Sequence, residues 1–193
     1  LDSTCPQGLA GRCEASRGGG RESTPTSTER GHMVTRVLIV YQSKTGNTEA
    51  MAKAVAAGVS REGLEVSVKR LEETNVDDLL EPAGIIIGSP TYFAGTTAEV
   101  KRLIDESIKH FGRLDGKAGA AFTSSGDLGG GNETALLDIL RAFLVHGMVV
   151  QGYTSGGHYG PVSIGAPDKE RQEVCEAFGA KFAKLVKRLA GSA

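Results

Sequence analysis

Hydrogen-bonding side chains are concentrated in residues 43–48, directly after an apolar run. Residues 37–42 read Val-Leu-Ile-Val-Tyr-Gln, residues 43–48 read Ser-Lys-Thr-Gly-Asn-Thr, and a helix-forming stretch begins at Glu49. This order predicts a strand, a tight loop and a helix N-terminus. The first N–H groups of a helix lack intrahelical partners and carry the positive end of its dipole, so they attract an anion. The loop hydroxyls and amide add donors, and together they suit a phosphate monoester.

The loop differs from two common phosphate-binding motifs. It lacks the G-x-x-x-x-G-K-[ST] pattern of a Walker A loop. It also lacks the three glycines that bring a dinucleotide close to the backbone. A single terminal phosphate, such as that of a mononucleotide, is the ligand that fits. The alternative is an ordinary strand-to-helix turn, in which Ser, Thr and Asn serve as caps.

Composition limits the classes of partner. The 193 residues carry a net charge of −1 at pH 7, which gives no basic surplus for nucleic acid. No apolar run approaches the ~18 residues that span a bilayer, so we expect no membrane partner. Cys5, Cys13 and Cys175 show neither zinc-site nor disulfide spacing. We therefore expect a cytoplasmic protein without a metal site.

The first 32 residues do not resemble part of a fold. They are rich in Gly, Ser, Thr and Arg and contain few apolar side chains, so they cannot bury enough surface to offset the entropy of ordering. Gly31-His32-Met33 resembles an expression scar or an upstream leader before a natural start. We expect residues 1–32 to form a disordered extension, leader or tag, and residues 33–193 to form one domain.

Strand and helix patterns alternate through this domain. Strands are expected at residues 37–42, 65–71, 84–88, 117–122 and 148–151, and helices at 48–62, 96–111, 132–147 and 168–189. Such alternation predicts an α/β fold: a doubly wound, five-stranded parallel sheet of order 2-1-3-4-5 with helices on both faces. In a sheet of this order a ligand binds at the carboxyl edge, between the first and third strands. A long Gly-rich loop is expected after the fifth strand.

Two further loops should open at the same edge. Residues 89–95 read Ser-Pro-Thr-Tyr-Phe-Ala-Gly, and residues 124–131 contain four glycines. Tyr92 or Phe93 could stack on a planar ring, and the glycines would let a ligand approach the backbone. Asp127 could accept a hydrogen bond from the ligand. The alternatives are aromatics that pack onto the domain and a flexible, solvated connection.

Helical spacing assigns several other side chains. Thr96 should begin the second helix with a capping box, and Ile108 and Phe111 should extend its buried stripe. Leu144 should lie on the buried face of the third helix, and His110 on the surface. No Ser-His-Asp or Cys-His arrangement is readable, so any chemistry would come from a cofactor rather than from a catalytic side chain.

The chain resembles flavodoxin-like FMN-binding proteins, whose sheets have the strand order 2-1-3-4-5. Residues 43–48 match the FMN-phosphate loop of flavodoxins. The segments 88–93, 122–126, 129–134, 146–150 and 159–160 are similar to WrbA-type NAD(P)H:quinone oxidoreductases. The resemblance implies a flavodoxin-like fold and FMN, with these residues around the cofactor: Ser43, Lys44, Thr45, Gly46, Asn47, Thr48, Pro90, Thr91, Tyr92, Phe93, Gly95, Ser124, Ser125, Gly126, Asp127, Gly129, Gly130 and His146.

The resemblance also implies two functions. One is two-electron transfer from NAD(P)H through FMN to a quinone-like small molecule. The other is a flavodoxin-type carrier that passes electrons between redox proteins. A net charge of −1 lacks the acidic field that steers short-chain flavodoxins to basic partners, which favours the enzyme. A domain that has lost its cofactor is a third alternative, and a homo-oligomer is left open.

Overall fold

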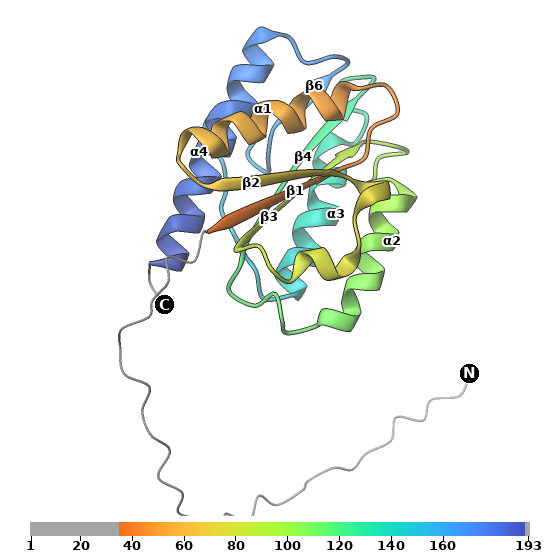
Figure 1. The fold of residues 1–193 in the computed structure, drawn as a ribbon. Helices are drawn as coiled ribbons and strands as arrows, with labels where there is room; N and C mark the ends of the chain where they lie inside the picture. The colour runs from red at the N-terminus through yellow and green to blue at the C-terminus, as the bar shows by residue number, and fades with distance from the viewer. Residues whose placement is uncertain (1–34, 192–193) are drawn as a thin grey trace, which may run out of the picture. The chain divides into compact units, whose positions relative to one another are not determined.

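The computed structural model describes residues 35–191. The expected extension at residues 1–32 lies outside this range and stays a prediction. The main strands and helices, shown in Figure 1, are β1 (Arg36–Tyr41), α1 (Asn47–Arg61), β2 (Glu65–Arg70), β3 (Gly84–Pro90), α2 (Ala98–Glu106), β4 (Ala118–Ser125), α3 (Asn132–Val145), β5 (Val149–Val150), β6 (Val162–Ile164) and α4 (Lys169–Ala190). Three short 3₁₀ helices connect them, at Leu71–Glu73, Val76–Leu79 and Ser107–His110.

The strands form a parallel sheet in the order β2-β1-β3-β4-β5, as the alternating pattern predicts. β2 lies at the edge, in agreement with its alternating sequence. β3 and β4 run further than expected, to Pro90 and Ser125. The hydroxyl-bearing ends of these two strands are therefore held in register, with Ser89 opposite Thr123.

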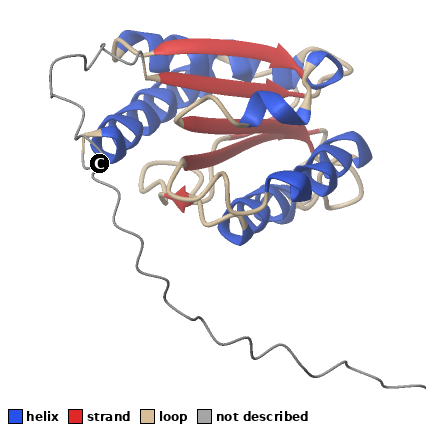
Figure 2. Cartoon of the chain, turned by 60° about the horizontal axis from the view of Figure 1, so that its bottom comes forward, coloured by secondary structure: helices blue, strands red, loops and turns tan. Residues whose placement is uncertain are grey.

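Helices cover both faces of the sheet (Figure 2). Val37 and Ile39 of β1 belong to the core cluster that includes residues of α1 and α4. Leu38 and Val40 belong to the cluster that includes residues of α2 and α3. Because successive side chains of a strand point to opposite faces, the apolar run of β1 supplies both cores at once.

The fifth position of the sheet differs from the prediction. β5 pairs only with the start of β4, and a separate strand, β6, pairs with its end. β6 lies inside the segment expected to be a Gly-rich loop. Gly160 allows this return, because a Cβ there would lie 2.0 Å from the Ala121 carbonyl oxygen of β4. The consequence is a paired backbone, not a free loop, beside residues 123–125.

The second helix also differs. Its N-cap is Thr97, whose side chain accepts a hydrogen bond from the N–H of Val100, and not Thr96. After Glu106 the helix tightens to 3₁₀ geometry, in which residues i and i+3 share a face. Ser107 and His110 therefore point inward, whereas Ile108 and Phe111 are 66% and 61% exposed. The expectations of a surface His110 and a buried Ile108 and Phe111 were wrong.

The burial of Leu144 differs from the prediction, whereas that of Cys175 agrees with it. Leu144 is 60% exposed, contrary to expectation, because the buried face of α3 ends at Phe143. Cys175 is fully buried on α4, and burial raises the pKa of its thiol to about 12. This thiol is a packing group, as predicted, and is not ionised at neutral pH.

Candidate functional site

Three loops leave the carboxyl ends of β1, β3 and β4 and meet at one rim of the sheet. The first and third are joined directly, because the hydroxyls of Thr48 and Ser124 lie 2.8 Å apart and are buried. This pair has two protons, and one hydrogen bond between the hydroxyls uses only one of them. The other proton is available to a ligand.

Thr91 joins the second loop to the third. Its N–H donates to the Ser124 carbonyl oxygen at 2.7 Å. Its hydroxyl lies 2.8 Å from that of Thr123 and donates to Asn132 Oδ1 at 3.2 Å. Thr123 in turn donates to the Ser89 carbonyl oxygen at 2.7 Å. The rim is thus fixed by hydrogen bonds between neighbouring strand ends.

The N-terminus of α1 is left open toward the rim. Its N-cap, Gly46, has φ +88° and provides no side-chain cap. The Gly46 N–H donates to Ser43 Oγ at 3.1 Å, which closes the loop on itself. The N–H groups of the first helical turn have no intrahelical acceptors, so Asn47 and Thr48 present donors at the positive end of the helix dipole.

The aromatic residues of the second loop occupy an exposed turn. Tyr92 and Gly95 form an isolated bridge, and Phe93 and Ala94 between them have φ of 47° and 62°. Positive φ is uncommon for residues with a side chain and often marks a functional turn. Phe93 is fully exposed, and Lys44 Nζ lies 5.4 Å from the centroid of the Tyr92 ring. Neither aromatic packs down into the domain core.

Together the loops enclose a cavity of about 220 Å³. Ten of its lining residues are predicted site residues, and Gly165 is an addition. The lining residues are Lys44, Thr45, Asn47, Thr48, Pro90, Thr91, Tyr92, Ser124, Ser125, Gly126 and Gly165. Gly165 follows β6 and donates its N–H to the Ser125 carbonyl oxygen. Its only sequence signal was its place in the Gly-rich segment.

Seven other predicted residues belong to the same loops without lining the cavity. They form the turns of these loops: the closed turn of the first loop, the bridged turn of the second and the glycine-rich bend of the third. Asp127, for example, accepts the N–H of Leu128 at 2.8 Å. The seven are Ser43, Gly46, Phe93, Gly95, Asp127, Gly129 and Gly130. Direct contact between them and a ligand stays a prediction.

His146 lies elsewhere. It follows the last residue of α3, whose first residue, Asn132, contacts the rim. Fourteen helical rises separate the two by about 20 Å. His146 Nε2 is instead 2.8 Å from Ser107 Oγ. The assignment of His146 to this chain's own cavity is therefore corrected, because α3 carries it to the opposite edge of the sheet.

The buried His146 makes stability depend on pH. Burial, and then the nearby His110, lowers its pKa below the usual value. The unfolded chain therefore binds a proton first as pH falls, and the free energy of unfolding decreases from near pH 6.5 downward. We expect the stability advantage of the wild type over His146→Gln to shrink between about pH 8 and about pH 5. Urea unfolding at each pH measures it, and a constant difference would contradict the prediction.

The donor set of the cavity fits a phosphorylated ring compound. Its lining side chains include hydroxyls, one amide, one ammonium group and one aromatic ring, and no Asp, Glu, His or Cys. Hydroxyls and open backbone N–H groups suit a phosphate. Among the described residues that line the cavity, no carboxylate, imidazole or thiol is present to activate a hydroxyl as a nucleophile or to bind a metal ion. Such a site binds and orients a cofactor that brings its own reactivity.

Residues 39–136 match the family model described as Flavodoxin. The chain belongs to the flavodoxin family. It is 39% identical over 160 residues to a flavodoxin of Aquifex aeolicus, covering 78% of this chain and 86% of the relative. It is 34% identical over 188 residues to an NAD(P)H dehydrogenase (quinone) of Archaeoglobus fulgidus, covering 80% and 98%. The relatives thus include one named as a flavodoxin and one named as an NAD(P)H dehydrogenase (quinone).

Solved structures show the same fold. A WrbA-like flavodoxin from Agrobacterium tumefaciens superposes with a TM-score of 0.70 at 25% identity, over 80% of this chain and 98% of that one. A flavodoxin from the domain Archaea gives 0.67 at 28% identity, over 79% and 99%. The predicted resemblance to flavodoxin-like proteins is confirmed.

Within residues 35–191, no helix has the length and apolarity needed to cross a bilayer.

Proposed function

We propose that this chain is an FMN-dependent oxidoreductase that accepts a hydride from NAD(P)H and delivers two electrons to a quinone-like acceptor. The observation that carries the proposal is the meeting of three polar loops around one cavity, with the open end of α1 on one side and Tyr92 on another. FMN, when bound, supplies the redox chemistry. The protein's groups bind it, orient it and limit access to it.

The phosphate end of FMN would lie on the first loop. Thr45, Asn47 and Thr48 provide side-chain donors, and the N–H groups of the first turn of α1 add the helix dipole. Within the described part of the chain, no carboxylate lines this cavity. The site therefore suits the dianionic form of the phosphate, which predominates above a pKa near 6.

The ring end would lie between the second and third loops. Pro90, Thr91 and Tyr92 form one wall, and residues 124–126 form the other. Tyr92 offers an aromatic face, and the hydrogen bond from the Thr91 N–H to the Ser124 carbonyl oxygen keeps the walls at a fixed spacing. Fixed walls favour a planar ligand because little side-chain ordering remains to be done on binding.

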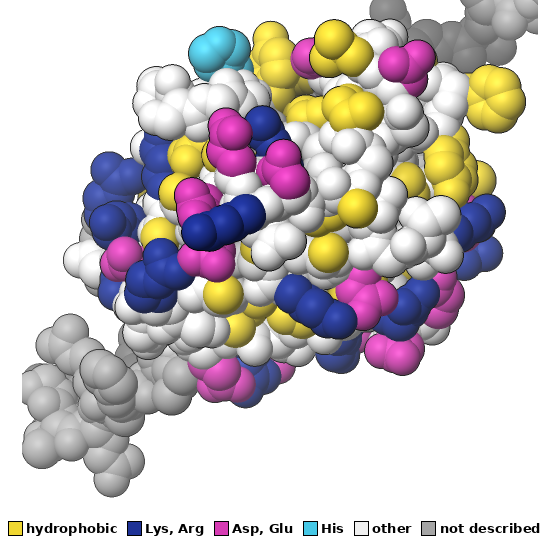
Figure 3. Space-filling model, turned by 90° about the horizontal axis from the view of Figure 1, so that it is seen from above, with side chains coloured by type: hydrophobic (Ala, Val, Ile, Leu, Met, Phe, Trp, Pro, Cys, Tyr) yellow, Lys and Arg dark blue, Asp and Glu magenta, His cyan; other side chains and the backbone are white. Residues whose placement is uncertain are grey.

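A flavodoxin-type electron carrier is the second candidate, favoured by the flavodoxin of Aquifex aeolicus among the relatives. Its partner would be a redox protein. Residues 1–33 contain four arginines and four acidic residues, so the rest of the chain keeps the net charge of −1. Figure 3 shows Lys and Arg interspersed with Asp and Glu on one face. The absence of a large net negative charge favours the enzyme over a strongly steered carrier.

Anaerobic titration of the FMN-loaded protein separates the two. If the enzyme proposal is right, NADPH or NADH bleaches the visible flavin absorbance, and a benzoquinone restores it. If dithionite bleaches the flavin absorbance but neither nucleotide does, the result supports the electron-carrier function instead. A protein that binds no added FMN contradicts both.

A further inference from the structure

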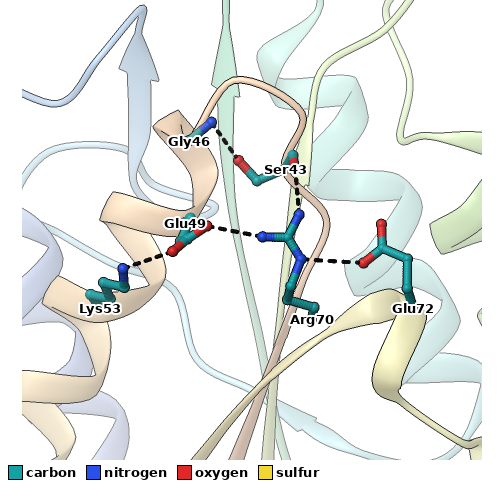
Figure 4. A network of polar contacts seen from close by, with 6 residues as sticks. All are labelled: Ser43, Gly46, Glu49, Lys53, Arg70 and Glu72. Atoms are coloured by element: carbon teal, nitrogen blue, oxygen red, sulfur yellow. Dashed lines mark hydrogen bonds and ion pairs between the residues drawn. The ribbon is translucent and has the colours of Figure 1, made fainter.

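Arg70, at the end of β2, reaches across to the first loop (Figure 4). Its register partner on β1 is Tyr41, and its guanidinium carbon lies 5.7 Å from the centroid of the Tyr41 ring. Nη2 donates to the Ser43 carbonyl oxygen at 3.0 Å, and Nη1 donates to Glu49 Oε2 at 3.1 Å. A single side chain therefore contacts both the first residue of the loop and the first turn of α1.

The first of these contacts supports the loop's shape. Arg70 holds the carbonyl of Ser43, while the side chain of Ser43 accepts the N–H of Gly46. Gly46 is the N-cap of α1. The hydrogen bonds thus run from β2 through Ser43 to the N-terminus of α1, where the N–H donors for an anion lie. A rigid planar guanidinium is suited to such bridging.

The second contact, between Arg70 and Glu49, compensates a negative charge near the anion site. Glu49 is the third residue of α1, so its carboxylate lies in the same turn as the donors of Asn47 and Thr48. A carboxylate there would repel a bound phosphate. Lys53 contacts Oε1 at 2.7 Å and Arg70 contacts Oε2 at 3.1 Å, so each oxygen has a cationic partner.

These partners keep Glu49 ionised and compensated. The hydrogen bond and charge of Lys53, followed by the smaller effects of Arg70, lower the pKa of the Glu49 carboxyl. Arg70 Nε also lies 3.7 Å from Glu72 Oε2, so the guanidinium has a second acidic partner. The arrangement in Figure 4 is therefore a balanced charge network beside the cavity, without a carboxylate on its lining.

We propose that Arg70 is a positioning residue for the phosphate end of the flavin: by holding the Ser43 carbonyl and compensating Glu49, it makes the site prefer FMN over riboflavin. The proposal rests on the proposed function only in that the cavity binds FMN. It does not require NAD(P)H turnover, so a carrier would show it as well.

The test compares the affinities of the full-length apoprotein for FMN and for riboflavin. For Arg70→Ala we expect FMN binding to weaken about tenfold, because hydrogen bonds to charged groups are lost and Glu49 is less compensated. Riboflavin binding should stay unchanged. Arg36→Ala is the matched control. Arg36 pairs with Glu65 and Glu81 at the other end of the same strands, so its loss should leave both affinities unchanged.

Charge removal then tests the mechanism. In Arg70→Ala/Glu49→Gln the repulsive carboxylate is absent, so FMN affinity should recover by several-fold relative to Arg70→Ala. Arg70→Lys, which keeps the charge but not the fork, should fall between the wild type and Arg70→Ala. Thermal melting of each variant checks that it is folded.

Three results would overturn the proposal. An equal loss of FMN and riboflavin affinity in Arg70→Ala would make Arg70 a general structural residue. A double variant as weak as Arg70→Ala would mean that Arg70 does not act by compensating Glu49, as the proposal requires. Unchanged FMN affinity in Arg70→Ala would remove the role altogether. If the wild type binds FMN but no nucleotide reduces it, only the enzyme proposal fails.

Discussion

Replacing Thr45 and Thr48 together with valine is expected to weaken FMN binding by about 100-fold or more. Valine has nearly the shape of threonine but no hydroxyl, so the double variant removes two donors that line the cavity. A hydrogen bond to a charged group contributes about 1.5–3 kcal/mol, and every 1.4 kcal/mol is about tenfold in affinity. The change of Thr48 to valine also leaves the Ser124 hydroxyl without its hydrogen-bond partner.

Fluorescence titration of the apoprotein with FMN measures this loss. Ser60→Ala, on the exposed face of the same helix, is the control and should bind FMN like the wild type. Thr45 is exposed, but Thr48 and Ser124 are buried, so loss of their hydrogen bond should lower the free energy of unfolding by about 1–3 kcal/mol. Urea unfolding shows whether the variant is still folded under the conditions of the titration. Wild-type affinity in the double variant would contradict the assignment of the phosphate to this loop.

Replacing Gly179 with alanine is expected to destabilise the domain, although alanine is the better helix former by about 1 kcal/mol. α1 and α4 cross with their backbones in contact at this point. A Cβ on Gly179 would lie 2.1 Å from the Val55 carbonyl oxygen, and one on Gly58 would lie 1.9 Å from that of Glu176. The obstacles are backbone atoms, so the two helices would have to separate, and the cost should be about 3 kcal/mol.

Thermal unfolding tests this prediction. A loss of about 3 kcal/mol corresponds to a midpoint lower by about 6–12 °C in a domain of this size. Ala57→Val adds bulk on the exposed face of α1 and should cost less than about 1 kcal/mol. A Gly179→Ala variant as stable as the wild type would mean that the helices can adjust without loss of packing.

The order of the strands could be predicted because each leaves a strong local pattern. The run at residues 37–41 is apolar on both faces and is fully covered, whereas residues 65–70 alternate and form the edge. The sequence also predicted the loops that share one cavity, because hydroxyls and glycines directly follow buried strands. The predicted residues that line it are Lys44, Thr45, Asn47, Thr48, Pro90, Thr91, Tyr92, Ser124, Ser125 and Gly126, and their contact with a ligand stays a prediction. Parallel topology alone then places these loops at one rim.

Other features depend on long-range contacts. β6 has only three residues and exists because the end of β4 offers it a paired edge. The burial of His110 depends on a change from α to 3₁₀ geometry after Glu106. His110 also bonds to Asp77, thirty-three residues earlier. Neither periodicity nor composition contains this information. The position of Arg70 beside the first loop likewise depends on the pairing of β2 with β1.

The most direct test of the central claim is an NMR titration of the isotope-labelled apoprotein with FMN. We expect the backbone amides of residues 43–48, 91–95 and 124–131 to shift together, saturating at one FMN per chain. The amides of residues 107–111 and His146, at the opposite edge, should remain unchanged. Shifts confined to that opposite edge, or no shifts at all, would contradict the claim that three loops of one rim enclose a flavin.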